Sequence, residues 1–345
     1  MTAQPLLGED ELGAMLAEAA DLASLSRGPL PAVLDTDFVR TGLHYQLRNG
    51  RPPRSVRLAQ SGAVRLFMEY DTLAETSARL PRFAEQLDVP AGRLRQILNQ
   101  DWLPHISVVQ VPPPLREADP RALEVRAVDP DDFPAAALAA LLSPCLLLTC
   151  NYRHFGVLGV RTRSQGKDGV MAVVAVNAGE MQLQAAVMIP AIPVRAAAGM
   201  MRSAYGRIGP AAWVIAGVMA GAGIWWYRQQ PPERRERIRT SAGQVGTHLV
   251  NRYQVAAAGA YQARVQLRAC LVPQPGDRTP ASAIIRELAL SPESLSAARL
   301  AELLDPDLRP PATGVRTFLR EHDDTVFRQV RRGGFVLGCH YQLPG

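Results

Sequence analysis

An acidic segment followed by an apolar strand constrains the fold of this chain more than any other feature. Asp129, Asp131 and Asp132 stand at the start of an alanine- and leucine-rich stretch that predicts a helix. The segment 146–151 follows as an apolar run that ends in Thr-Cys-Asn, which is typical of a buried strand with a polar end. Open α/β sheets form their sites at the carboxyl ends of their strands, so this order predicts a charged site at that edge. The alternative is a solvated helix N-terminus with acidic caps.

Two more acidic residues follow apolar segments nearer the start of the chain. The apolar run 32–34 ends on Asp35, which predicts a strand with a carboxylate at its carboxyl end. A second apolar run, 64–68, predicts another strand, and the helix expected over 70–80 carries Glu75 on its first turns. Carboxylates that meet at one edge of a sheet repel one another unless a cation offsets their charge. Mg²⁺ or Mn²⁺ is the hard divalent ion that such oxygens prefer.

The order of these motifs resembles the PIN-domain nuclease family, which includes the ribonuclease toxins of bacterial toxin-antitoxin pairs. The resemblance covers about residues 30–177 and is carried by Val33-Leu34-Asp35, Leu73-Ala74-Glu75, Asp129 to Asp132 with the alanine run after it, and Leu148 to Asn151 with Phe155. One departure stands in the last motif. Many members carry an acid where this chain has Asn151, and some toxin-like members have Asn there with an Asp three residues on, where this chain has His154.

The resemblance implies a metal-dependent endoribonuclease that hydrolyses RNA phosphodiester bonds with Mg²⁺ or Mn²⁺. The implied catalytic residues are Asp35, Glu75, Asp132, Asp129, Thr149 and Asn151, of which the first four are the implied metal ligands. Single-stranded or looped RNA suits a shallow acidic site. An antitoxin-like inhibitor is a further implied partner. The departures at Asn151 and His154 keep an alternative open, a catalytically decayed nucleic-acid-binding or regulatory protein.

The positive charge of the chain comes almost entirely from arginine. The formal net charge is +6 with a pI near 9.4, and guanidinium groups bind phosphate oxygens in pairs. Arg48, Arg51 and Arg54 cluster around a predicted loop over 49–53. We expect them either to hold an RNA backbone near the acidic site or to form a solvated face.

The four cysteines show no pairing or metal-binding pattern. None belongs to a CxxC motif, and none has the histidine spacing of a zinc site. A reducing compartment follows as the expectation, and the N-terminus lacks the basic start and apolar core of a secretory signal. We therefore expect a cytoplasmic protein, with membrane association as the alternative.

The composition divides the chain into four segments. Residues 1–28 predict an amphipathic helix, and 29–177 predict the nuclease-like α/β domain, a parallel sheet flanked by helices that ends with a strand over 170–176. Residues 178–272 predict a helical region, in which 208–227 form a 20-residue stretch without a charge. That stretch has the length of a membrane span, and a buried helix or an oligomer contact is the alternative.

The last segment, 278–345, predicts three helices followed by a β-hairpin. This order resembles a winged helix, of the LOTUS type that accompanies some ribonucleases. Arg316 and Arg320 fall on the third helix, and Arg331 and Arg332 fall at the tip of the hairpin, where such modules meet phosphates. We expect this small α+β domain to bind RNA, DNA or protein. We also expect the chain to form a homo-oligomer.

Overall fold

The fold is taken from a computed structural model that describes most of the chain. The described residues are 29–182, 184, 229–275, 279–291, 293–323, 325–330 and 334–343. The expected N-terminal helix, the uncharged stretch 208–227 and the pair Arg331 and Arg332 lie outside them. Within the described residues, no helix combines the length and apolar character that crossing a bilayer needs. The chain divides into two compact units, one of residues 1–173 with 264–345 and one of residues 174–263.

A five-stranded, mostly parallel sheet forms the centre of the first unit, in the order β3-β2-β1-β4-β5. The strands are β1 (Leu30–Leu34), β2 (Val64–Glu69), β3 (Ile106–Val109), β4 (Cys145–Leu148) and β5 (Leu271–Val272). The first four are parallel, and β5 pairs antiparallel to β4. Leu34 lies opposite Leu148, so β1 and β4 end side by side. The expected α/β class is confirmed.

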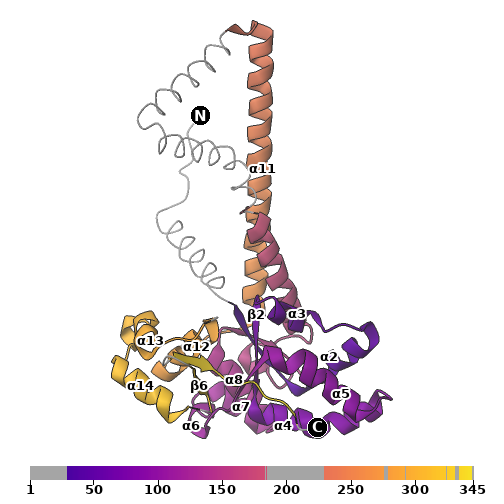
Figure 1. The fold of residues 1–345 in the computed structure, drawn as a ribbon, viewed down its shortest axis with the longest axis vertical. Coiled ribbons are helices and arrows are strands. Elements are labelled where there is room, and N and C mark those ends of the chain that lie inside the picture. Colours follow the sequence, from indigo (N-terminus) through magenta and orange to yellow (C-terminus); the bar gives the residue numbers. More distant parts are fainter. Residues whose placement is uncertain are drawn as a thin grey trace, which may run out of the picture. The chain divides into compact units, whose positions relative to one another are not determined.

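Helices connect the strands and surround the sheet (Figure 1). They are α2 (Thr36–Asn49), α3 (Arg54–Gln60), α4 (Tyr70–Gln86), α5 (Ala91–Ile97), α6 (Pro113–Arg116), α7 (Pro120–Val128) and α8 (Phe133–Leu142), with one π-helical segment at Leu98–Trp102 and short 3₁₀ turns at Leu103–His105 and Gly156–Leu158. All ten residues of α8 are buried. A helix that is apolar on every side must be covered on every side, and α8 contacts the sheet on one side and α12 (Pro280–Leu290) on another.

The strand predicted over 170–176 is wrong, because residues 165–182 form a helix. Val170, Val173 and Val176 are buried at a spacing of three residues, which fits one face of a helix. A short apolar run does not distinguish a buried strand from a buried helix by periodicity. The region 178–272, which was expected to be helical, contains the long helix α11 (Pro232–Cys270). Gly179 approaches Ala260 of α11 so closely that a side chain at position 179 would meet it.

The three helices and the hairpin expected at the C-terminus are present. They are α12, α13 (Ala297–Leu303), α14 (Ala312–Glu321) and the antiparallel pair β6 (Phe327–Val330) and β7 (Gly334–Leu337). They share one apolar core with the sheet, since Phe67 and Leu138 belong to the same cluster as Ile285 and Phe335. Cys339 also exchanges two backbone hydrogen bonds of 2.8 Å with Val108 of β3. The segment is therefore part of the first unit.

Arg65 of β2 ties α12 to the sheet. Its guanidinium donates to the carbonyl oxygens of Leu288, Ala289 and Ser291 at 2.8, 3.1 and 2.6 Å, which caps the carboxyl end of α12. Burial lowers the pKa of Arg65, and its charge is offset by these carbonyl dipoles.

Replacing Arg65 by Met should therefore destabilise the protein. Hydrogen bonds to charged groups contribute about 1.5–3 kcal/mol, so we expect Arg65→Met to lower the free energy of unfolding by about 2–3 kcal/mol in urea titrations. Arg93→Met is the matched control, because Arg93 is exposed and, among the described residues, its guanidinium bonds only to Gln96. Equal stability of the two variants would contradict the role of Arg65.

Candidate metal centre

Asp35 lies at the carboxyl end of β1, beside the end of β4. Its backbone N–H donates to the carbonyl of Leu148 at 3.1 Å, which fixes its position at the sheet edge. The side chain is only 3% exposed, and Thr149 Oγ1 donates to its Oδ2 at 2.7 Å. Burial raises the pKa of Asp35 to about 7, the hydrogen bond from Thr149 opposes the rise, and the carboxylates of Asp132 and Asp37 add to it.

Asp132 is linked to Asp35 through the turn that follows β4. Thr149 Oγ1 accepts from the backbone N–H of Asn151 at 2.9 Å, and the Asn151 side-chain amide donates to Asp132 Oδ2 at 3.0 Å. His154 Nδ1 lies 2.6 Å from the same oxygen and 3.3 Å from Asp129 Oδ2. Burial raises the pKa of Asp132, and the hydrogen bond to His154 opposes that rise.

Glu75 joins this group from the second turn of α4. The Thr36 hydroxyl donates to its Oε2 at 2.6 Å, and Arg79 contacts its Oε1 at 2.7 Å. The other end of the Arg79 guanidinium lies 3.0 Å from Asp131 Oδ2. Burial raises the pKa of Glu75, the Thr36 hydrogen bond and the Arg79 charge oppose the rise, and Asp131 and Asp129 add to it. The acid on α4 therefore lies within the electrostatic field of the loop between α7 and α8.

The four predicted metal ligands interact through their charges, but only Asp129 and Asp132 belong to the compact group of possible ligands, which does not include Asp35 or Glu75. The four acids come from three stretches of sequence: Asp35 after β1, Glu75 on α4, and Asp129 with Asp132 before α8. Within the described residues, Asp129, Asp132 and His154 offer ligand atoms that all lie within 4.8 Å of one another. Oxygen ligands suit Mg²⁺ or Mn²⁺, and an imidazole beside them favours Mn²⁺ of the two.

The arginines predicted to hold RNA beside these acids belong to the far end of α2, the loop after it and the start of α3. α2 starts directly after Asp35 and runs away from the sheet edge, so Arg48 lies about 18 Å further along its axis than Thr36 at 1.5 Å per residue. Arg51 follows the end of α2, and Arg54 begins α3. Their contact with RNA stays a prediction, with a solvated face as its alternative. Arg316 and Arg320 are exposed on α14.

Arg79 and the contacts of His154 are the two features of the site that sequence reasoning missed. The signal for Arg79 was present, because Glu75 and Arg79 are four residues apart on a predicted helix and face each other at that spacing. For His154, the sequence predicts that it lies in the turn after β4, but it does not predict that its ring points toward Asp132 and Asp129.

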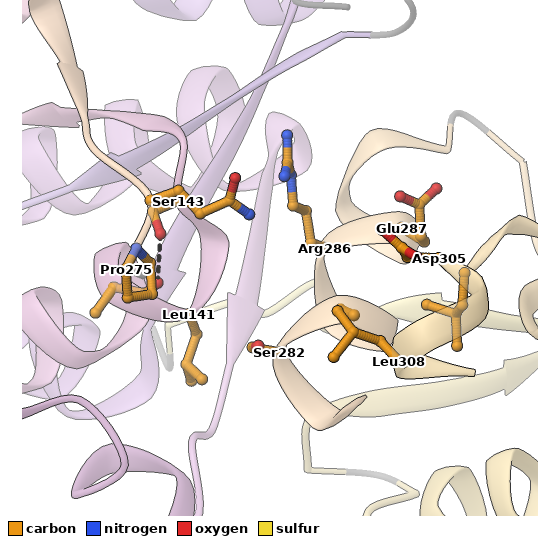
Figure 2. A pocket seen from close by; sticks show the side chains of 12 residues that line it. Leu141, Ser143, Pro275, Ser282, Arg286, Glu287, Asp305 and Leu308 are labelled. Atoms are coloured by element: carbon orange, nitrogen blue, oxygen red, sulfur yellow. Dashed lines mark hydrogen bonds between the residues drawn. The ribbon is translucent and has the colours of Figure 1, made fainter. Parts of the chain in front are cut away.

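A separate pocket lies at the other end of α8. It encloses about 40 Å³ between the carboxyl end of α8 and α12, enough for a few water molecules. Figure 2 shows Leu141 and Ser143 on one side and Ser282 and Arg286 on the other. Asp132 precedes the amino end of α8, so this pocket is not part of the acidic site.

Comparisons with known proteins give no match to this chain, whether with protein families, with curated proteins or with solved structures. The fold and the site together define an α/β protein with an acidic cluster at the carboxyl edge of a parallel sheet.

Proposed function

We propose that the chain is a metal-dependent endoribonuclease of the PIN type. The observation that supports it most is that Asp35 and Glu75 lie close enough to Asp132 for their charges to interact, although about a hundred residues of sequence lie between Asp35 and Asp132. Burial disfavours the charged form of each carboxylate, and a divalent cation would restore it. Such an ion lowers the pKa of a bound water and offsets charge on the attacked phosphate.

The surrounding polar residues have positioning roles in this proposal. Thr149 holds Asp35, and Asn151 holds Asp132, each through one hydrogen bond. Because Asn151 also donates its backbone N–H to Thr149, the two acids are held by one connected network. Such networks keep ligand oxygens in place before an ion arrives.

The C-terminal segment would bind the same RNA through α14. Arg316 and Arg320 are exposed one helical turn apart, and neither forms an ion pair with any residue that the structure describes. We propose that this segment is a winged-helix-like module, with protein contact as the alternative to RNA binding.

Cleavage of a mixed RNA pool tests the proposed activity. We expect purified protein to cut RNA in Mn²⁺ and to lose this activity in EDTA, and we expect Asp132→Asn to lose about two to three orders of magnitude in rate. Asp88→Asn is the matched control, because it removes the same charge from an exposed position after α4. Intact RNA with the wild-type protein, or equal rates for wild type and Asp132→Asn, would refute the nuclease.

A metal-free nucleic-acid-binding regulator is the second candidate function. It is favoured by the contacts that these acids already make within the protein, since Arg79 contacts Glu75 and the ring of His154 contacts Asp132 and Asp129. Melting curves separate the two candidates. A metal enzyme gains melting temperature as Mn²⁺ is added, and a regulator without a metal site does not.

A further inference from the structure

Arg79 occupies the position from which a metal ion would approach Glu75. One end of its guanidinium lies 2.7 Å from Glu75 Oε1, and the other lies 3.0 Å from Asp131 Oδ2. The Thr36 hydroxyl takes the remaining oxygen of Glu75 at 2.6 Å. Both oxygens of this acid are therefore in use within the protein itself.

A divalent cation and this guanidinium cannot share Glu75 without strong repulsion. Mg²⁺ binds carboxylate oxygen at about 2.1 Å. An ion on Oε1 would then lie less than about 4.8 Å from the Arg79 nitrogen, because that nitrogen is 2.7 Å from the same oxygen. Two positive charges at this separation in a half-buried site repel each other strongly. Arg79 is 44% exposed, so its side chain can turn away without disturbing the core.

We propose that Arg79 is a resident counter-ion that competes with the divalent cation for Glu75 and, once displaced, binds a phosphate of the RNA. This inference rests on the proposed nuclease function. Asp131, whose side chain is 65% exposed, keeps the guanidinium close to the site after it leaves Glu75. The planar fork of an arginine matches two phosphate oxygens, as it matches a carboxylate. The same residue thus stabilises the metal-free acids and contacts the substrate in the loaded enzyme.

Calorimetric Mn²⁺ titration of Arg79→Gln tests the competition. We expect this variant to bind Mn²⁺ about tenfold more tightly than the wild type, because the competing charge is gone. At saturating Mn²⁺, we expect the KM for RNA to rise about tenfold through loss of the phosphate contact. Arg82→Gln is the matched control. Arg82 is exposed three residues further along α4 and forms no ion pair with a described residue, so its Mn²⁺ affinity should stay within about twofold of wild type.

A second variant separates competition from structural damage. Glu75→Gln breaks the same ion pair but removes a ligand, so its Mn²⁺ affinity should fall while that of Arg79→Gln rises. A general loss of structure would lower both. Equal or weaker Mn²⁺ binding by Arg79→Gln overturns the inference and leaves the nuclease proposal standing. Absence of Mn²⁺ binding by the wild type would overturn both the inference and the nuclease proposal. The titration of the wild type alone reveals this outcome.

Discussion

Asp35→Asn should stabilise the metal-free protein at pH 8 while abolishing RNA cleavage. The carboxyl of Asp35 is almost fully buried, and its pKa rises from 3.8 to about 7 on folding, with burial as the main cause. The folded protein therefore holds more protons than the unfolded chain between about pH 4 and pH 7. Stability falls as the pH rises through that window, by up to about 4 kcal/mol for a shift of this size. An asparagine carries no charge to bury and still accepts the hydrogen bond from Thr149.

Urea unfolding in EDTA at pH 5 and pH 8 measures this effect. Wild-type protein should be less stable at pH 8, and Asp35→Asn should lose most of that difference. Asp88→Asn is the control, because it removes the same charge from an exposed position after α4 and Asp88 is not among the groups that shift the pKa of Asp35. A lower stability of Asp35→Asn than of wild type at pH 8 in EDTA would show that burial of this carboxylate costs nothing.

Addition of Mn²⁺ should reverse the order of the two proteins. The wild type gains stability from the ion, whereas Asp35→Asn lacks one of its ligands and gains little. The rate of RNA cleavage by Asp35→Asn should be about three orders of magnitude below that of the wild type, which corresponds to an activation barrier about 4 kcal/mol higher. The same substitution thus stabilises the fold and removes the function, which is the pattern of a residue kept for its chemistry.

Local sequence patterns were sufficient to predict the central strands. β1, β2 and β4 are apolar runs bounded by polar residues, and their carboxyl ends could be aligned once the strands were taken as parallel. The edge strand β5 could not be predicted this way. It has two residues, Leu271 and Val272, and they reach the sheet only after the 39-residue helix α11. Its pairing with β4 depends on tertiary packing and leaves no periodic signal.

Some residues of the candidate site could likewise be placed from local sequence patterns, and others could not. Asp35 is fixed by the end of β1, so its place could be predicted, and Glu75 reaches the same edge because α4 follows β2 directly. The direction of α2 separates Arg48 from Asp35, although the two residues are close in sequence. Sequence proximity alone therefore does not place an arginine beside the acids, and the arginine that contacts them, Arg79, was found only in the structure.

An acid at the end of a strand is not sufficient to define the site, as Glu69 demonstrates. Glu69 ends β2 at the same edge as Asp35 and is fully buried. Its carboxylate accepts from the backbone N–H groups of Asp71 and Val111 at 2.5 and 3.2 Å, and Arg116 lies 2.7 Å away. Burial raises the pKa of Glu69, and the Arg116 charge and the backbone hydrogen bonds oppose the rise. The charge of Glu69 is offset by Arg116 and by backbone N–H groups. We therefore infer a structural role for this residue.

Arg116→Met should therefore be among the most destabilising single substitutions in the chain. It leaves the Glu69 charge buried without a partner, and breaking a buried pair in this way costs about 3–5 kcal/mol. The Arg116 bonds to the Val111 carbonyl and the Asp71 carboxylate, both 2.6 Å long, are lost as well. We expect the loss in urea unfolding to shrink as the pH falls, because protonation of Glu69 removes the unpaired charge.

The double variant Glu69→Gln with Arg116→Met isolates the cause of that loss. With no charge left to bury, it should recover a large part of the stability that Arg116→Met loses, and a double variant as unstable as the single one would show that packing dominates instead. Arg126→Met is the control, since Arg126 pairs with Glu117 where both side chains are about half exposed, and such pairs contribute about 0–1 kcal/mol.

Mn²⁺ binding should survive in the folded fraction of Arg116→Met, because none of the four predicted metal ligands contacts Arg116 among the bonds of the described residues. Loss of stability with retained metal affinity is the opposite of the result expected for Asp35→Asn, and the two variants together distinguish the carboxylate that supports the sheet from the one that serves the site.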